Sequence, residues 1–182
     1  MWGEQARKLW DLAADQHGFV TARGAEESGI DRTVLVKLAG RGRLERRAWG
    51  VYRFPDFPVG RLDEYALAAL WPAGRGVLSH ETALELHDLC DVNPEKIHVT
   101  VPTRYRPRRG GAADLYVIHH EDLTDHQIGW VEGIRVVAPT HAIVQAVEGG
   151  LAPHLVEQAI STARRRGLLD DAELADAGLD GR

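Results

Sequence analysis

The first 54 residues contain three short segments that are typical of helices, and a glycine follows each of them. Apolar side chains recur at helical spacing over residues 3–17, and Gly18 follows them. Glycine commonly ends a helix because it adopts the left-handed backbone conformation at little cost. Thr21 is placed to cap a short second helix and Asp31 a third helix over residues 32–39, since both side chains accept hydrogen bonds from helical N–H groups. The sequence therefore predicts three short helices in succession.

Two short strands are expected directly after the third helix. Residues 44–48 and 51–54 are joined by Trp49-Gly50, and two short runs around a glycine-containing link are typical of a β-hairpin. Three helices followed by a hairpin are the plan of the winged helix-turn-helix, whose third helix reads the major groove of DNA. Trp49 and Tyr52 are expected to pack in the core or within the hairpin rather than to stack on bases.

A proline- and glycine-containing stretch, residues 55–60, interrupts the chain after the hairpin. It predicts a winged helix-turn-helix domain over residues 1–56 and a second domain over residues 61–182. Helical segments are expected in this second domain at 62–71, from a Ser79 cap to Leu89, and at 139–147, 153–166 and 170–177. Strands are expected at 97–101, 115–119 and 130–137, the last of them bent at Glu132-Gly133. The predicted fold class is α+β, with a small mixed C-terminal domain.

The net charge of −5 conceals a strongly basic stretch. Residues 32–53 hold seven Arg or Lys side chains against one carboxylate, Glu45, which gives +6 locally and leaves −11 on the rest of the chain. Such asymmetry indicates a surface that binds a polyanion. The residues predicted to bind DNA are Arg32, Thr33, Val36, Lys37, Arg41, Arg43, Arg46, Arg47 and Arg53.

These residues are expected to divide between bases and phosphates. Arg32, Thr33 and Lys37 share the polar face of the third helix and are candidates for base contacts, with Val36 against a thymine methyl group. Arg41 and Arg43 follow the helix, where the DNA backbone would pass. Arg46 and Arg47 are adjacent on a strand and point to opposite faces, so only one of them easily meets DNA.

A second basic cluster lies in the sequence TRYRPRRGG, which proline and glycine mark as a loop between strands. This loop is either a solvated hairpin tip or a second nucleic-acid surface on which the tyrosine stacks. The residues concerned are Arg104, Tyr105, Arg106, Arg108 and Arg109.

The nine histidines raise the question of a metal site. His80 and His87 are two helical turns apart, which is too far for two ligands of one ion. His98 could approach His119 or His120, which point to opposite faces of their strand. On this spacing we predict no metal site and no cofactor.

The sequence offers little for catalysis. A metal-dependent nuclease would need clustered carboxylates with a lysine; Asp114 is a possible first ligand, but no Glu-x-Lys pattern follows it. The single cysteine, Cys90, excludes an internal disulfide. We therefore predict a protein without catalytic residues, located in the cytoplasm, with no membrane-spanning or export segment.

Over roughly residues 5–150 the chain resembles the AbiEi antitoxins of type IV toxin–antitoxin (abortive infection) systems. The segments that carry the resemblance are GRLERRAWGVYR, LSHETALELHDL and IHVTVP. The resemblance implies a winged helix-turn-helix that binds repeats in the promoter of its own operon and represses transcription. It also implies a C-terminal domain that counteracts a nucleotidyltransferase-like toxin without forming a stable complex with it.

The expected function is therefore a DNA-binding autorepressor and antitoxin, not an enzyme, whose partner is double-stranded operator DNA with inverted repeats. Two alternatives stay open. One is a metal-dependent nuclease that the winged helix targets to DNA, and the other is a one-component regulator whose second domain binds a small ligand.

Overall fold

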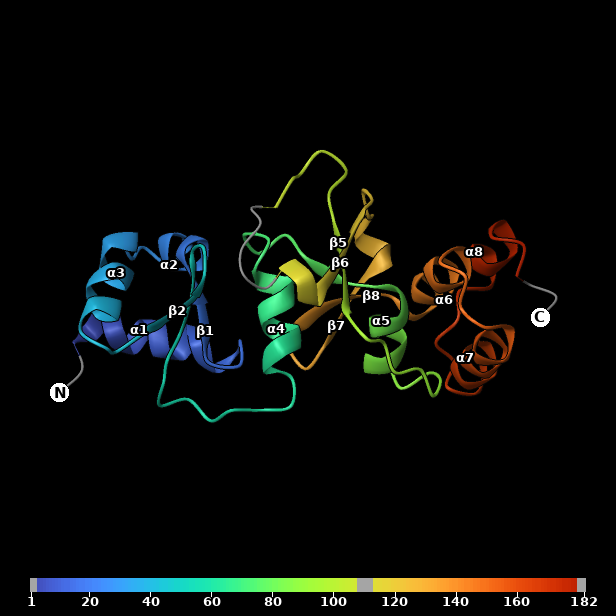
Figure 1. The fold of residues 1–182 in the computed structure, drawn as a ribbon, viewed down its shortest axis with the longest axis horizontal. Coiled ribbons are helices and arrows are strands. Elements are labelled where there is room, and N and C mark those ends of the chain that lie inside the picture. The colour runs from blue at the N-terminus through green and yellow to red at the C-terminus, as the bar shows by residue number, and fades with distance from the viewer. Residues whose placement is uncertain (1–2, 108–112, 180–182) are drawn as a thin grey trace. The chain divides into compact units, whose positions relative to one another are not determined.

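The computed structural model describes residues 3–107 and 113–179 of the chain (Figure 1). The chain folds into two compact units, Met1–Gly76 with Arg106–Ala113, and Val77–Tyr105 with Asp114–Arg182. Helices and two separate sheets make up the structure, which is mixed α+β as predicted. Of the helices in the described ranges, none combines the length and the apolar composition required to cross a bilayer.

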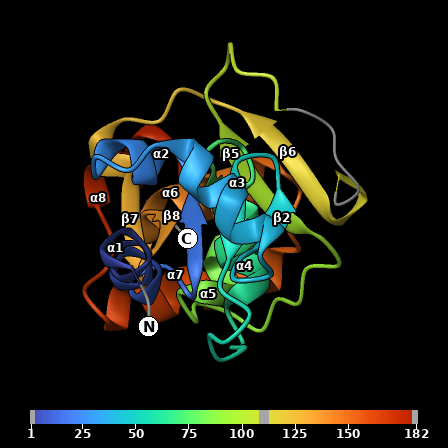
Figure 2. The ribbon, with the colours of Figure 1, turned by 90° about the vertical axis from the view of Figure 1, so that its left-hand side faces the viewer.

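The N-terminal unit has the element order of a winged helix. Its elements are α1 (Glu4–Ala14), β1 (Phe19–Thr21), α2 (Ala22–Glu27), α3 (Arg32–Gly40), β2 (Glu45–Ala48), β3 (Val51–Arg53) and α4 (Asp63–Leu70). The three strands form an antiparallel sheet in the order β1-β3-β2. Figure 2 views this unit from the side on which α1, α2 and α3 lie. Strand β1 was not predicted, because three residues are too few to show an alternating pattern.

Both helix caps predicted for the N-terminal unit are confirmed. Thr21 Oγ1 accepts a hydrogen bond of 2.9 Å from the Gly24 N–H, and Asp31 Oδ1 accepts one of 2.7 Å from the Thr33 N–H. Such a cap is worth about 1 kcal/mol. Gly18 (φ +81°) ends the turn after α1, and a Cβ there would lie 2.6 Å from the Phe57 ring. The position therefore excludes a side chain on steric as well as conformational grounds.

The hydrophobic core of this unit is shared by the helices and the sheet. Leu9, Leu35, Leu44 and Phe54 are almost completely buried, and Trp10 lies edge-on to Phe54 with ring centroids 5.1 Å apart. Each large apolar side chain buried in this way contributes about 2 kcal/mol. Burial of Leu35 fixes which face of α3 turns inward.

The compact N-terminal unit extends past the boundary that the sequence suggested. The segment 55–60 is not a free linker: Phe57 packs against the core, and the Arg53 guanidinium donates to the Pro58 carbonyl at 2.9 Å. The same Arg53 Nη2 lies 2.8 Å from Asp63 Oδ2 at the start of α4. These contacts tie α4 to the winged helix, so the division between units follows Gly76.

The C-terminal unit is built on a mixed five-stranded sheet in the order β6-β5-β4-β8-β7. Strand β4 pairs antiparallel with β5 and parallel with β8, and β5 pairs parallel with β6. Helix α6 packs against α5, α7 and α8 (Figure 1). The elements are β4 (Val77–Leu78), α5 (His80–Leu86), β5 (Ile97–Val101), η1 (Ala113–Leu115), β6 (Tyr116–His120), η2 (Asp125–Gln127), β7 (Ile128–Val131), β8 (Ile134–Val137), α6 (Pro139–Glu148), α7 (Pro153–Arg165) and α8 (Asp171–Asp176).

The structure differs from the expectations for this unit in three details. The bend predicted at Glu132 (φ +45°) and Gly133 (φ +80°) is present, but it reverses the chain, so β7 and β8 form an antiparallel hairpin rather than one bent strand. The central strand β4 was missed because it has only two residues. The Ser79 side chain does not cap α5; the Gln145 Oε1 accepts from the His80 N–H at 3.2 Å instead.

Candidate nucleic-acid interface

Helix α3 presents a polar face that the winged helix leaves exposed. Leu35 is buried, whereas Arg32, Thr33 and Lys37 are more accessible, and 59% of Val36 is exposed. The predicted division of this helix into a core face and an outer face is therefore confirmed. An apolar side chain among basic and hydroxyl groups is a composition suited to base edges, which offer both hydrogen-bonding groups and thymine methyls.

The β2–β3 hairpin places more basic groups after this helix. Arg41 and Arg43, in the connection to β2, are exposed, as are Arg46 and Arg47 on β2 itself. The Arg46 guanidinium lies 5.0 Å from the centroid of the Trp49 ring, a cation–π contact. Arg47 Nη1 lies 4.0 Å from Glu45 Oε2, a long and exposed ion pair.

Trp49 and Tyr52 differ in their exposure to solvent. Tyr52 is 8% exposed and packs in the core, as predicted, but Trp49 is 62% exposed at the hairpin tip. Trp49 therefore does not pack in the core; its contact with Arg46 lies within the hairpin, the other position that the sequence predicted for it. Trp49 and Arg46 together form an amphipathic tip on the wing.

Arg53 requires a correction, because it does not lie on the basic surface. Only 4% of the residue is exposed, and its guanidinium donates to Asp63 Oδ2, the Pro58 carbonyl and the Phe54 carbonyl at 2.8, 2.9 and 3.3 Å. These partners fix the guanidinium inside the N-terminal unit. Its position at the end of the sheet's central strand, which sequence reasoning could not supply, accounts for the difference.

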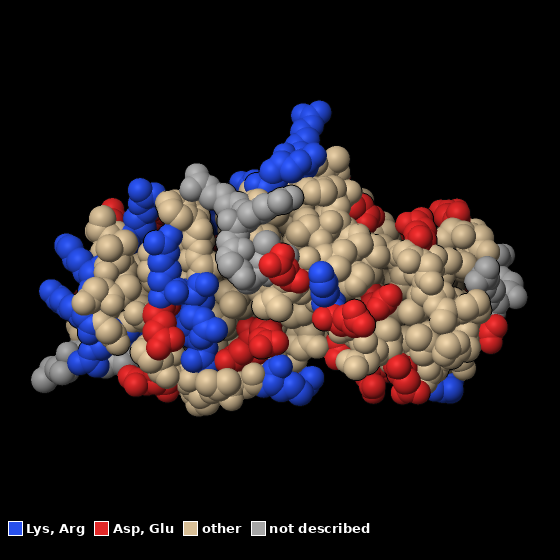
Figure 3. All heavy atoms as spheres, in the orientation of Figure 1, with Lys and Arg blue, Asp and Glu red and all other residues tan. Residues whose placement is uncertain are grey.

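Of the seven basic side chains in residues 32–53, all except the buried Arg53 are accessible. They neighbour one another along the chain from α3 to β2, and Figure 3 shows Arg and Lys gathered on the N-terminal unit, while Asp and Glu predominate on the C-terminal unit in that view. The six are Arg32, Lys37, Arg41, Arg43, Arg46 and Arg47. Accessible cations in this number attract a polyphosphate backbone through the release of its condensed counterions.

The second basic cluster lies partly outside the described residues. Arg104 and Arg106 are exposed and Tyr105 is half-buried, in the loop between β5 and β6. The Tyr105 N–H donates to the Pro102 carbonyl at 2.8 Å, which closes a turn. Arg108 and Arg109 fall outside the part of the chain that the structure describes. Both interpretations of this loop therefore stay predictions.

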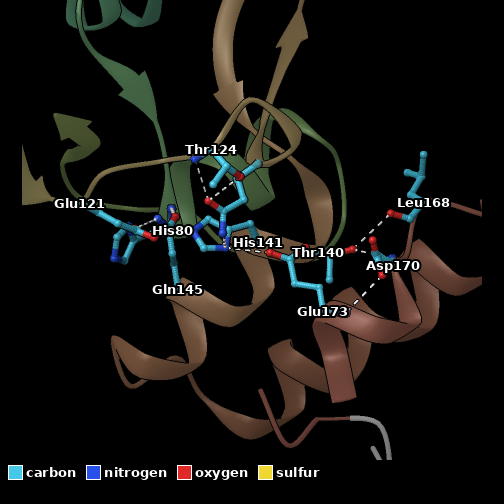
Figure 4. Close-up of polar contacts among 10 residues, drawn as sticks. His80, Glu121, Thr124, Thr140, His141, Gln145, Leu168, Asp170 and Glu173 are labelled. Atoms are coloured by element: carbon cyan, nitrogen blue, oxygen red, sulfur yellow. Dashed lines mark hydrogen bonds and ion pairs between the residues drawn. The ribbon is translucent and has the colours of Figure 1, made fainter. Parts of the chain in front are cut away.

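The C-terminal unit holds a different kind of polar site, formed in its interior. His141 on α6 is 7% exposed and lies between two carboxylates, with Nε2 2.7 Å from Glu121 Oε1 and Nδ1 2.9 Å from Glu173 Oε1 (Figure 4). Gln145 donates to Glu121 Oε2 at 2.6 Å and accepts from the His80 N–H. The network joins four segments of this unit that are distant in sequence.

Three histidines lie beside this network. His98 on β5 and His119 on β6 are brought together, with His98 Nδ1 3.1 Å from His119 Nε2, and the His80 ring stacks on His119 with centroids 3.5 Å apart. His87 lies apart from them and contacts the Val137 carbonyl through Nε2 at 2.8 Å. The spacing had offered His119 and His120 equally to His98, and the parallel register of β5 and β6 selects His119.

The N-terminal unit thus has the architecture of the winged helix-turn-helix class of DNA-binding domains. Residues 7–55 match the sequence model of a family described as transcriptional regulator, AbiEi antitoxin. The match confirms the resemblance to AbiEi antitoxin transcriptional regulators over the winged helix, residues 7–55.

Comparison with solved structures extends to both units. The crystal structure of the RV2827C protein from Mycobacterium tuberculosis is similar to this chain, with a TM-score of 0.56 and 19% sequence identity. The similarity covers 100% of this chain and 73% of that chain. At this identity it establishes a common fold only. No curated protein matches the sequence.

Proposed function

We propose that this protein represses transcription of its own operon and acts as the antitoxin of a type IV toxin–antitoxin system in the cytoplasm. The observation that carries the proposal is that the outer face of α3, the connection after it and strand β2 of the wing together expose six basic side chains. The AbiEi match over residues 7–55 supports the regulatory part.

In the proposed mechanism α3 enters the major groove and the protein occludes the promoter. Arg32, Thr33 and Lys37 contact base edges, and Val36 contacts a thymine methyl group. Arg41, Arg43 and one or both wing arginines contact phosphates, which fix the register of the helix without reading sequence. Arg53 is excluded from this surface because it is buried against Asp63.

Operator repeats would give each half-site one winged helix. Helix-turn-helix proteins bind such repeats as pairs, so that the symmetry of the site matches that of the protein. Under this proposal affinity falls with salt: three or four phosphate contacts would give a slope of log K against log[salt] of roughly −3 to −4.

Fluorescence anisotropy of the full chain on its own upstream DNA tests the regulatory proposal. A scrambled duplex of the same composition, a salt series and a parallel series with Mg²⁺ run alongside. Tight, sequence-dependent binding that weakens steeply with salt and leaves the DNA intact supports the proposal. Equal, weak binding to both duplexes would make the winged helix a protein-interaction module, and Mg²⁺-dependent cleavage would identify a nuclease.

The antitoxin part needs a separate experiment in cells. The nucleotidyltransferase-like protein encoded next to this gene would be expressed alone and together with this chain. Restored growth without co-purification of the two proteins supports a type IV antitoxin. Unchanged toxicity contradicts the antitoxin role, and a stable complex contradicts the type IV mechanism.

A second experiment on the wing decides which adjacent arginine faces DNA. Arg46→Ala and Arg47→Ala are compared for affinity and for salt slope, with Arg165→Ala on α7 as an exposed control. Loss of a phosphate contact lowers the magnitude of the salt slope by about 1. Equal behaviour of all three variants would remove the wing arginines from the interface.

A further inference from the structure

A cluster of three imidazoles lies in the C-terminal unit, independent of the DNA-binding surface. His80 begins α5, His98 lies on β5 and His119 on β6. Each offers one ring nitrogen, and the three chosen atoms lie within 4.8 Å of one another. Three histidines that converge from three elements are one of the ligand sets found in zinc sites.

The sheet register brings two of these ligands together. Thr100 pairs with His119 and His98 pairs with Val117 in the parallel β5–β6 ladder, so His98 and His119 lie on the same face of the sheet on diagonal positions. Their ring nitrogens are 3.1 Å apart. Two nitrogens that bind one Zn²⁺ tetrahedrally at 2.0–2.1 Å are about 3.3 Å apart, so this pair already has the required separation.

The third histidine is held close but is not yet aligned. The rings of His80 and His119 are stacked within 17° of parallel, so coordination of one ion by both requires one ring to rotate out of the stack. His80 has a positive φ of 52°, a conformation that costs a non-glycine residue free energy. Its backbone N–H donates to Gln145 Oε1. At the ring, Ser79 Oγ lies 3.1 Å from Nδ1, and such a second contact commonly orients a histidine ligand.

The electrostatics of the cluster suit a cation. Burial lowers the pKa of His80 to about 3 and that of His119 to about 4, and it also lowers the pKa of His98. All three imidazoles are therefore neutral near pH 7, the form that binds metal. Two carboxylates act in the opposite direction, Glu81 on His98 and Glu121 on His119, which shows that negative charge lies nearby.

We propose that His80, His98 and His119 bind one divalent transition-metal ion, Zn²⁺ in particular, with a fourth position left for water or another ligand. Imidazole nitrogen is a ligand that suits Zn²⁺, whereas Mg²⁺ and Ca²⁺ prefer oxygen. The ion would connect the start of α5 to the β5–β6 edge of the sheet. This proposal differs from the prediction made from sequence spacing, which was that the histidines form no metal site.

Equilibrium dialysis of the tag-free full chain against Zn²⁺, after treatment with a chelator, tests the proposal. We expect one zinc per chain and a higher melting temperature of the zinc-loaded protein. His119→Gln is expected to weaken zinc binding at least tenfold, as are His98→Gln and His80→Gln. His120→Gln, the neighbouring and exposed position on β6, is the matched control and should retain the wild-type affinity.

Two further results decide the outcome independently of the folding of any single variant. Co²⁺ added to the wild-type chain should give the intense visible bands of a tetrahedral site, which octahedral aqueous Co²⁺ lacks. Circular dichroism of each variant checks that it is folded. Substoichiometric zinc in the wild type, or equal affinity of folded His119→Gln and His120→Gln, would overturn the proposal and leave the three rings as packing groups.

Discussion

The two units of this molecule use their ionisable side chains in opposite ways. In the N-terminal unit the basic groups from Arg32 to Arg47 stand on the surface, and Arg53 is turned inward. In the C-terminal unit His80, His98 and His119 are half-buried and His141 is almost completely buried. An exposed cationic surface suits a large polyanionic partner, whereas an interior polar cluster suits a small ligand or a structural role.

The two arrangements also differ in the free energy that each requires in the absence of a ligand. Exposed arginines remain hydrated and lose little when DNA is absent, so they can accumulate along one stretch of chain. Buried histidines must be neutral or paired, because an isolated charge is costly in the interior. The carboxylates of Glu121 and Glu173 on the two ring nitrogens of His141 satisfy this requirement.

The largest effect is expected when exposed charge is removed from the N-terminal unit. Arg32→Ala combined with Lys37→Ala is expected to weaken operator binding roughly 100-fold or more, since each such contact is worth about 1–3 kcal/mol. Anisotropy titrations at one salt concentration measure the change. Arg164→Ala combined with Arg165→Ala on α7 is the control, and an equal loss there would mean that net charge, not this surface, governs binding.

Two neighbours on α3 separate core packing from recognition. Leu35→Ala is expected to lower the free energy of unfolding by about 3 kcal/mol because it leaves a cavity in the core. Val36→Ala, one position along and exposed, should change stability by less than about 0.5 kcal/mol while weakening operator binding. Urea denaturation and anisotropy measure the two effects. Equal destabilisation by both substitutions would contradict the orientation of α3.

Removal of Asp63 tests the inward position of Arg53. Asp63→Ala leaves the guanidinium with carbonyl partners only and is expected to destabilise the N-terminal unit by about 2 kcal/mol. Operator affinity of the folded variant should be unchanged, since neither residue lies on the basic surface. A large loss of affinity at full stability would instead return Arg53 to the interface.

The smallest effect is a pH dependence of the C-terminal unit. Burial, together with the charge of Arg166, lowers the pKa of His87 in the folded state, while its hydrogen bond to the Val137 carbonyl opposes the shift. The unfolded chain therefore binds a proton first as pH falls below about 6.5, and stability decreases until the pH passes the folded-state pKa. Above that range the stabilisation is fully present.

His87→Gln keeps a donor for the Val137 carbonyl and cannot titrate. Between pH 7 and 5, a range that spans the ordinary histidine pKa of about 6.5, the unfolding free energy of this variant should therefore fall less than that of the wild type. Chemical denaturation at a series of pH values makes the measurement. His154→Gln, at an exposed position of α7, is the control and should follow the wild-type profile. Identical profiles for all three proteins would exclude His87 as a source of the dependence.

Most of the N-terminal unit could be predicted from local patterns in the sequence. The caps Thr21 and Asp31, the glycine after α1 and the Trp49-Gly50 link are local signals, since each acts on residues within one helical turn or one hairpin. For the same reason the outer face of α3 followed from helical periodicity alone. Arg53 escaped this reasoning because its burial depends on Asp63, ten positions away on another element.

The contacts of the C-terminal site depend on packing between elements that are distant in sequence. His80, His98 and His119 are separated by 18 and 21 positions and meet because β5 and β6 pair in parallel register beside α5. His141 meets Glu121 and Glu173 across 20 and 32 positions. No spacing along the chain encodes such contacts, because they depend on strand order and on which short strand, β4, occupies the centre of the sheet. Local periodicity fixes which way a side chain points, but packing fixes what it meets.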